Sequence, residues 1–185
     1  MTISFIGGGV MAESFIAGVL KEGLFSSDQI YVSDPIADRR KYLTDTYGVN
    51  CLKENIDILE KKGKILLAVK PQTLPEVYKD LKGKISPERP VISIVAGSKS
   101  SDLSKGLEHQ QIIRVMPNTP SQIGKGMLVW TSTDEVDPTA IGEIASILKT
   151  LGDEYYVHDE KYMDMATALS ASGPAYVFLF IQSLI

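Results

Sequence analysis

Residues 5–12 read Phe5-Ile6-Gly7-Gly8-Gly9-Val10-Met11-Ala12, and this stretch decides the fold. It ends a short apolar run and opens an amphipathic stretch that continues to Glu22. At such a junction Gly7 permits a tight turn, Gly9 lets a pyrophosphate approach the backbone, and Ala12 lets a helix pack closely on a strand. The stretch therefore predicts a dinucleotide site, with the pyrophosphate on the N–H groups that begin the helix.

A plain turn is the alternative, and the pattern of the following residues argues against it. Short β-branched runs alternate with amphipathic stretches, as parallel strands linked by crossover helices do. The predicted strands are Ile3–Ile6, Ile30–Val32, Ile65–Val69, Val91–Val95, Ile112–Val115, Leu128–Trp130 and Tyr155–Val157. The predicted helices are Val10–Glu22, Ala37–Tyr47, Asn55–Glu60, Leu74–Leu81, Ser101–Leu107 and Pro138–Leu151. We expect an α/β fold, a Rossmann-type doubly wound sheet over residues 1–158.

The composition is that of a folded chain without a nucleic-acid partner. With 185 residues, 44% of them hydrophobic, the chain can form one domain and a fragment of another. A net charge of −4 without a basic block argues against nucleic acid. The single Cys51 permits no internal disulfide, indicates a reducing compartment, and is expected to be a buried structural thiol. The start of the chain lacks the basic region and cleavage site of a signal peptide, so we expect a cytoplasmic protein.

The last residues, 159–185, predict the truncated start of an all-helical domain. Ser172-Gly173-Pro174 resembles the beginning of a helix, whose free N–H groups would receive a carboxylate. The stretch from Ala175 to Ile185 is apolar on nearly every side, so that it must be buried by something. It is too short to span a bilayer, which takes roughly 20 residues. We interpret it as the first part of a domain that binds a partner through its apolar surface.

The end of the second predicted strand leaves the choice of cofactor open. Asp34 stands where an acidic residue holds the adenosine ribose, and it would favour NADH by repelling a 2′-phosphate. Arg39 and Arg40 would instead pair with that phosphate and permit NADPH. A third interpretation is that Asp34 only caps the helix after Pro35. The sequence predicts NADPH or NADH without choosing between them.

Three later strand ends have the composition of ligand-facing loops. They are Ala68-Val69-Lys70-Pro71-Gln72, Val95-Ala96-Gly97 and Arg114-Val115-Met116-Pro117-Asn118-Thr119-Pro120. Ligands of such sheets bind beyond the carboxyl ends of the strands. Lys70 is equally well explained as an exposed lysine. The two prolines around Asn118-Thr119 make a stiff loop, which favours a functional role.

These motifs together resemble the pyrroline-5-carboxylate reductase family. The stretches that carry the resemblance are residues 5–12, 68–72 and 114–120 and Leu169-Ser170-Ala171-Ser172-Gly173-Pro174-Ala175-Tyr176. The resemblance implies reduction of the ring imine of 1-pyrroline-5-carboxylate to proline with NAD(P)H in the cytoplasm. It also implies an N-terminal Rossmann domain and a helical C-terminal domain that forms homodimers or larger homo-oligomers, without nucleic-acid or membrane partners.

The resemblance also implies which residues form the site. The cofactor would contact Gly7, Gly8, Gly9, Val10, Met11, Asp34, Asn55, Ala68, Val69, Lys70, Pro71, Ala96 and Gly97. The substrate would lie near Asn118, Thr119, Glu160, Ser172 and Gly173. The family usually has glycine where this chain has Ala171. A threonine of the family's helical domain, near the imine nitrogen, would lie beyond Ile185, so that no catalytic residue is assigned and the activity of these 185 residues alone stays open.

Other chemistry has weaker support. The sequence lacks metal-ligand spacing and a nucleophile triad, and we expect His109 and His158 at the surface. Two alternative functions remain: a non-catalytic dinucleotide-binding regulator of the same fold, or a related oxidoreductase resembling β-hydroxyacid dehydrogenases.

Overall fold

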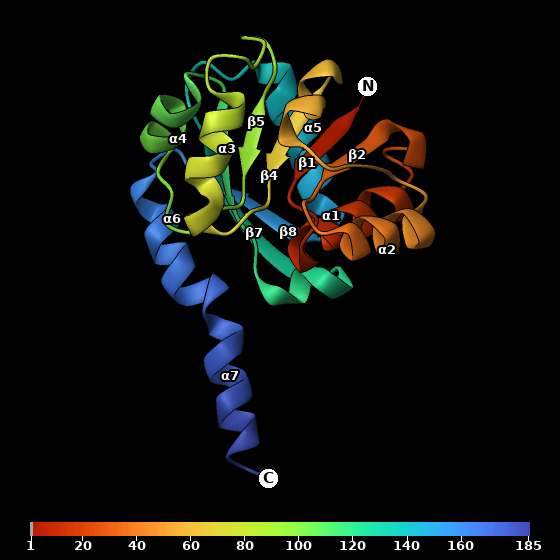
Figure 1. Ribbon diagram of the computed structural model, residues 1–185. Coiled ribbons are helices and arrows are strands. Elements are labelled where there is room, and N and C mark those ends of the chain that lie inside the picture. Colours follow the sequence, from red (N-terminus) through yellow and green to blue (C-terminus); the bar gives the residue numbers. More distant parts are fainter. Residues whose placement is uncertain (1) are drawn as a thin grey trace.

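The computed structural model of the protein describes residues 2–185, which form one sheet with helices on both faces (Figure 1). The strands are β1 (Ile3–Ile6), β2 (Ile30–Ser33), β3 (Asn50–Leu52), β4 (Lys64–Leu67), β5 (Val91–Ser93), β6 (Ile112–Met116), β7 (Gly126–Ser132) and β8 (Gly152–Tyr156). Their order across the sheet is β3-β2-β1-β4-β5-β6-β7-β8. This arrangement confirms the predicted Rossmann-type doubly wound fold.

The strand order reverses at β1. In the parallel register Ile6 lies opposite Ser33 of β2 on one side and opposite Leu67 of β4 on the other. Strands β1 to β6 are parallel, β7 is antiparallel to β6, and β8 is parallel to β7. The crevice outside the carboxyl end of β1 is therefore the position where sheets of this kind bind a ligand.

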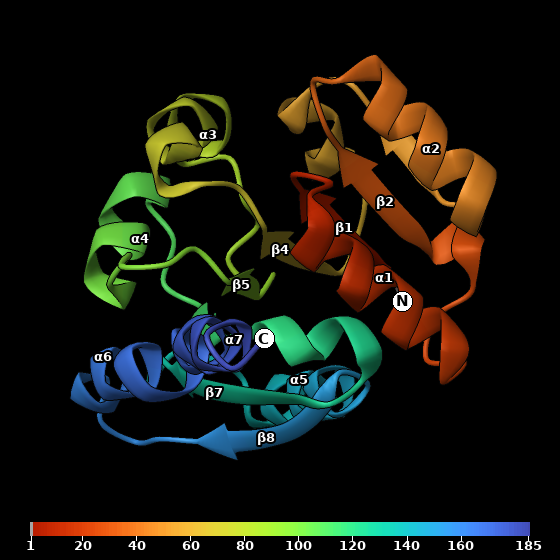
Figure 2. The same ribbon diagram turned by 90° about the horizontal axis from the view of Figure 1, so that it is seen from below.

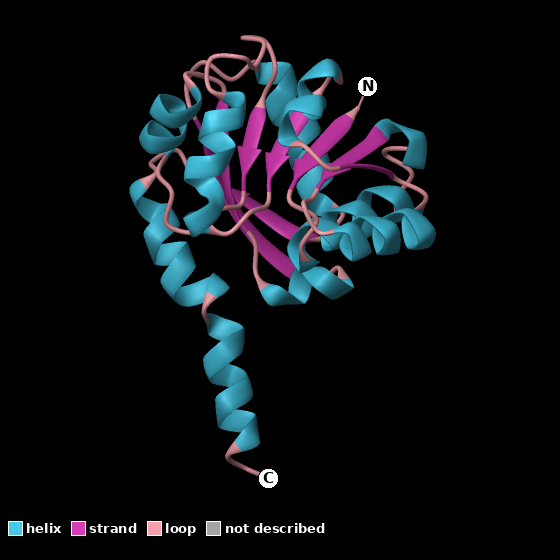
Figure 3. Cartoon of the chain, in the orientation of Figure 1, coloured by secondary structure: helices cyan, strands magenta, loops and turns pink. Residues whose placement is uncertain are grey.

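Helices close both faces of the sheet (Figure 3). The α-helices are α1 (Val10–Lys21), α2 (Ala37–Tyr47), α3 (Leu74–Leu81), α4 (Ser100–Leu107), α5 (Pro138–Lys149), α6 (Lys161–Ala166) and α7 (Gly173–Gln182). Short 3₁₀ turns are η1 (Ser27–Gln29), η2 (Asn55–Glu60), η3 (Pro71–Thr73) and η4 (Thr119–Ile123), and η5 (Thr167–Ala171) is a π-helical segment. The predicted Asn55–Glu60 helix is thus a 3₁₀ helix.

Alternating side chains of the strands fill two apolar cores. Phe5 packs in one core with Phe15 of α1 and Ile144 of α5, all fully buried. The other core places Ile65 with Leu103 of α4 beneath α3 and α4. A strand that buries both faces must be apolar throughout, which explains the continuous apolar runs. Each such side chain stabilises the fold by about 1.5–3 kcal/mol on full burial.

Element boundaries differ from the prediction where the chain leaves the sheet. Strands β4 and β5 end at Leu67 and Ser93, earlier than predicted, because the residues after them turn into the loops at the carboxyl edge. The edge strand β3, Asn50–Leu52, was not predicted, since three residues with a polar start give no apolar run. Its Cys51 is only partly buried, against the expectation of a buried thiol.

The last helical segment leaves the sheet at its carboxyl edge, with a bend at Ser172 just before α7 (Figure 1). Residues Lys161–Gln182 form one helix of 22 residues that passes through the π-helical segment η5. By length and composition alone it would reach across a membrane, unlike the shorter stretch considered from the sequence. Its apolar side chains from Val177 onward, Phe178 and Phe180 among them, are exposed within this chain. The division into domains 1–158 and 159–185 stays a prediction.

Two glycines offer a matched test of the packing. At Gly152, with φ of +143°, an added Cβ would strike the backbone of Gly126, because β7 and β8 pair there. At Gly142, inside α5, a Cβ meets no heavy atom of the described residues within 4 Å. We expect Gly152→Ala to lower the free energy of unfolding by at least about 1–3 kcal/mol, and Gly142→Ala to raise it by about 0.5–1 kcal/mol. Urea unfolding followed by circular dichroism measures both, and equal effects would contradict the packing.

Candidate active site

The turn after β1 is held between two neighbouring strands. Gly7 has φ of +91°, and its N–H donates to the Ser33 carbonyl over 2.8 Å. A Cβ at this position would lie 2.8 Å from the Ala68 carbonyl oxygen. Only glycine therefore fits, because the backbone conformation and the space both exclude a side chain.

Gly9 leaves the approach to helix α1 open. It is exposed, and a Cβ there would meet no heavy atom within 4 Å among residues 2–185. Its carbonyl accepts the N–H of Glu13, and this hydrogen bond is the first of the 12-residue helix α1. The N–H groups at such a helix start attract a phosphate. Residues 7–11 therefore fit a pyrophosphate, and the absence of a side chain at Gly9 makes room for it.

Asp34 lies beside this turn, at the end of β2. Its carboxylate accepts the Gly8 N–H and the Ile36 N–H, each over 2.9 Å, and the residue is 8% exposed. Asp34 thus holds the turn before α2 but does not cap that helix, because the N-cap is Ile36, so the capping alternative is wrong. Asp34 also lies where a ribose would be held. Asn55 is close by: it accepts the Ser33 hydroxyl and donates to Asp80, both over 2.8 Å.

The other predicted loops lie at the same edge (Figure 2). Residues 68–71 follow β4, Ala96-Gly97 follow β5, and Asn118-Thr119 follow β6. Lys70 is exposed. The Asn118 carboxamide is more constrained, because its oxygen accepts the Met127 N–H over 3.0 Å. Its nitrogen donates to the hydroxyl and carbonyl of Ser170 over 3.4 Å, which ties the loop to the last helix.

The Ser172-Gly173 segment forms the expected helix start, directly after the π-helical segment η5. The Ser172 N–H and hydroxyl both donate to the Thr167 carbonyl over 3.0 Å, and the Ala175 N–H donates to the Ser172 carbonyl. Helix α7 begins at Gly173 with Ser172 as its N-cap, and the binding of a substrate carboxylate to the N–H groups after Ser172-Gly173 stays a prediction. Pro174 still occupies a first-turn position of α7. Segments of this π-helical kind are frequent at functional sites.

Glu160 fastens the last helix to the sheet. Its Oε1 accepts the Ser100 N–H over 2.8 Å, the Ser100 hydroxyl over 2.9 Å and the Arg114 guanidinium over 2.8 Å. Arg114 is 3% exposed and also lies 3.6 Å from Asp164. Partial burial raises the pKa of Glu160, but the hydrogen bonds from Ser100 and Arg114 outweigh it and hold the pKa below its usual value. Glu160 therefore remains charged at neutral pH.

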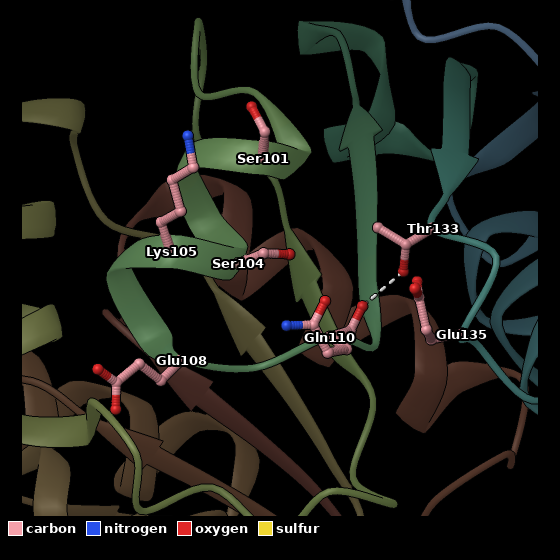
Figure 4. A pocket seen from close by; sticks show the side chains of 7 residues that line it. All are labelled: Ser101, Ser104, Lys105, Glu108, Gln110, Thr133 and Glu135. Atoms are coloured by element: carbon pink, nitrogen blue, oxygen red, sulfur yellow. Dashed lines mark hydrogen bonds between the residues drawn. The ribbon is translucent and has the colours of Figure 1, made fainter.

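Hollows are also found away from the glycine turn. One, of about 710 Å³, runs along α4 between Lys105, Glu108 and the turn after β7 (Figure 4). Gln110 lines this hollow and comes just before β6. This end of the hollow therefore lies at the amino-terminal edge of the parallel strands, whereas Gly7 lies at their carboxyl edge. The second, of about 310 Å³, is lined by Ser100, Glu160 and His158, among other residues. The shape of the chain alone thus does not single out the glycine turn.

His109 corrects one expectation. It is 3% exposed, and its Nε2 lies 2.8 Å from the Arg89 carbonyl oxygen. Burial lowers the pKa of His109, so the neutral ring is favoured. The predicted surface position is wrong because the polar residues around His109 surround a ring that faces the interior. His158 is exposed, as expected.

Comparison with known proteins identifies the family. Residues 160–185 match the family described as pyrroline-5-carboxylate reductase dimerisation, and residues 2–97 match NADP oxidoreductase coenzyme F420-dependent. The chain is 39% identical to pyrroline-5-carboxylate reductase of Synechocystis over 98% of its length and 67% of that protein. The chain belongs to the pyrroline-5-carboxylate reductase family.

Solved structures of pyrroline-5-carboxylate reductases agree in fold. The enzyme of Coxiella burnetii gives a TM-score of 0.92 at 32% identity, over 99% of this chain and 68% of the other. A Plasmodium falciparum pyrroline carboxylate reductase with NADP bound gives 0.88 at 29% identity, over 100% of this chain and 67% of the other. This chain thus spans about two thirds of the length of these pyrroline-5-carboxylate reductases.

The predicted site residues fall into three groups at one edge. Gly7–Met11 follow β1, Asp34 follows β2 and Asn55 begins η2, while residues 68–71 and 96–97 lie beyond β4 and β5. Asn118 meets the last helix at Ser170, two residues before Ser172-Gly173. Sequence reasoning missed Arg114 as the partner of Glu160. A buried arginine within an apolar strand requires an acidic partner, and this was a usable signal.

A substitution at Gly9 tests the pyrophosphate position. Because a side chain there meets open space in the protein, we expect Gly9→Val to keep the fold and its thermal midpoint within a few degrees. We also expect at least about a tenfold loss of affinity for NADH and NADPH, about 1.4 kcal/mol or more. Fluorescence titration measures the affinity. Unchanged affinity for both dinucleotides would contradict the assignment.

A pH series tests the Glu160 fastening. Because the folded-state pKa of Glu160 is lowered, its contribution is fully present above about pH 4.5 and is lost as the pH falls below that value, through the lowered pKa. The free energy of unfolding of the wild type should therefore fall more steeply below pH 4.5 than that of Glu160→Gln. Urea unfolding between about pH 7 and 3 measures both, with the exposed Glu135→Gln as control. If the free energies of unfolding of wild type and Glu160→Gln fall in parallel as the pH is lowered, the contacts of charged Glu160 with Ser100 and Arg114 do not stabilise the fold.

Proposed function

We propose that this protein reduces 1-pyrroline-5-carboxylate to proline with NADPH or NADH, the last step of proline biosynthesis. The single observation that carries the proposal is the open backbone at Gly9, at the switch point of the sheet. The same edge holds the Asn118–Ser170 contact, where the last helix meets the loop after β6. A dinucleotide and a small imino acid would meet there.

The cofactor is held by three parts of the crevice. Residues 7–11 receive the pyrophosphate through N–H groups, because Gly9 presents no side chain. Asp34 and Asn55 lie near the adenosine ribose. Residues 68–71 and Ala96-Gly97 line the nicotinamide side, beyond the carboxyl ends of β4 and β5. The structure of a relative with NADP bound supports use of this cofactor class.

The substrate lies between the loop after β6 and the last helix. We place it near Asn118, Thr119, Ser172 and Gly173, with Glu160 close by. The Ser172 N–H and hydroxyl are taken by Thr167, so the substrate carboxylate needs other donors. Thr119 is exposed and follows Asn118, which is held by the Met127 N–H. It therefore offers a hydroxyl at the carboxyl edge of the sheet, where the substrate would lie.

The reaction demands positioning more than acid–base catalysis. The ring C=N accepts a hydride at carbon and a proton at nitrogen, and a cyclic imine takes up its proton readily. When bound, NAD(P)H supplies the hydride and leaves as NAD(P)⁺. The residues of this chain hold the ring carbon against the nicotinamide. Alignment of this kind accounts for much of the rate enhancement of an enzyme.

The apolar last helix suggests the partner. Side chains from Val177 to Ile181 are exposed, and residues 160–185 match the dimerisation region of the family. A helix with this composition must be covered. We propose that a second copy of the protein covers it in a homodimer or larger homo-oligomer, and that the enzyme acts in the cytoplasm.

The two alternative functions are not favoured. A non-catalytic regulator or an enzyme resembling β-hydroxyacid dehydrogenases would share the glycine turn and the sheet. Neither accounts for 39% identity to a pyrroline-5-carboxylate reductase over nearly the whole chain. Neither accounts for the match of residues 160–185 to the reductase dimerisation region.

An activity assay of the full-length protein tests the proposal. We expect proline to form from pyrroline-5-carboxylate with NADPH, NADH or both, and Gly9→Val to reduce the rate at subsaturating cofactor by about tenfold or more. Cofactor oxidation at 340 nm and proline formation are followed together. Tight cofactor binding without turnover would favour the regulator. Oxidation of a β-hydroxy acid in place of imine reduction would favour the dehydrogenase alternative.

A further inference from the structure

An arginine of α2 lies across the dinucleotide turn. Arg39 donates through Nε to the Gly8 carbonyl and, over 3.5 Å, through Nη2 to the Gly9 carbonyl. The neighbouring Arg40 donates to the Asp34 carbonyl over 2.7 Å. Both guanidinium groups thus stand at the end of β2, where a cation accommodates the 2′-phosphate that distinguishes NADPH from NADH.

Arg39 already has an anionic partner. Its Nη2 forms an ion pair with Oε2 of Glu13, in the first turn of α1. The two side chains are 22% and 20% exposed, so water only partly screens the pair. The guanidinium also lies 5.0 Å from the centre of the Tyr42 ring. A 2′-phosphate must therefore compete with Glu13 for this cation.

Glu13 is itself held in place. Its Oε1 accepts the hydroxyl of Tyr42 over 2.9 Å and that of Tyr47 over 2.8 Å. Burial raises the pKa of Glu13, but the hydrogen bonds from Arg39, Tyr47 and Tyr42 outweigh it and keep the carboxyl charged. Burial and the Glu13 charge raise the pKa of Tyr47 to about 12, so this tyrosine remains a donor.

We propose that Glu13 sets the dinucleotide preference of this enzyme by holding Arg39. The carboxylate neutralises the cation that a 2′-phosphate needs. NADH carries only an uncharged hydroxyl at this position and therefore loses nothing to the ion pair. The inference rests on the proposed function only in assuming that a nicotinamide dinucleotide binds at the Gly7–Gly9 turn.

Glu13→Gln tests the inference, because the amide oxygen can still accept from Tyr42 and Tyr47 while the charge is lost. We expect the ratio of the NADH to the NADPH dissociation constant to rise about fivefold, the size of effect that a partly exposed ion pair supports. Calorimetric titration measures both constants without turnover. Glu22→Gln, which removes a charge just after the far end of α1, is the matched control.

Arg39→Met provides the second arm. This substitution should weaken the binding of NADPH more than the binding of NADH. When Glu13→Gln is added to Arg39→Met, the ratio of the two dissociation constants should no longer change. High salt should shrink the fivefold effect, because it screens the charges. The inference is overturned if Glu13→Gln leaves the ratio unchanged, or if it changes the ratio equally with and without Arg39. Either outcome leaves the proposed function standing. If neither dinucleotide binds the wild type, the proposed function fails as well.

Discussion

The left-handed turn at Gly7 is the constraint on which the rest of the structure depends. Its N–H binds the Ser33 carbonyl, and the missing side chain lets the Ala68 carbonyl approach closely. The ends of β1, β2 and β4 are thereby brought together at the switch point of the sheet. The chain then enters α1 with Gly9 exposed, so that the helix start faces solvent and not the core.

Two sets of polar contacts bring the last helix to the same edge. Asn118 pins the loop after β6 to Ser170, and Glu160 joins Ser100 and buried Arg114. Truncating one partner of a buried charge pair costs several kcal/mol, because it leaves the other charge without compensation. These contacts anchor the first part of the helix at the edge, beside the π-helical segment, while α7 beyond it exposes its apolar side chains.

Local patterns in the sequence were sufficient for the sheet except its edge strand β3, for the long helices over its faces and for the glycine turn. Apolar runs that alternate with amphipathic stretches predict strands and helices directly, and the glycines predict a tight turn. Residues 3–6, 37–47 and 74–81 form elements with the predicted bounds. The rest depends on contacts between distant residues. The π-helical pairing of Ser172 with Thr167, the burial of His109 and the Arg114–Glu160 pair involve partners that periodicity does not reveal. For the same reason the sequence left Asp34, Arg39 and Arg40 as competing interpretations, whereas the structure pairs Arg39 with Glu13 and Arg40 with the Asp34 carbonyl.

Amide hydrogen exchange with and without NADPH tests the central claim most directly. If the Gly7–Gly9 turn grips the pyrophosphate, protection on binding should be greatest for residues 8–11 and extend to residues 68–70 and 96–97. The hollow beside Lys105 and Glu108 should not change. Protection at that hollow, with none at the glycine turn, would contradict the account.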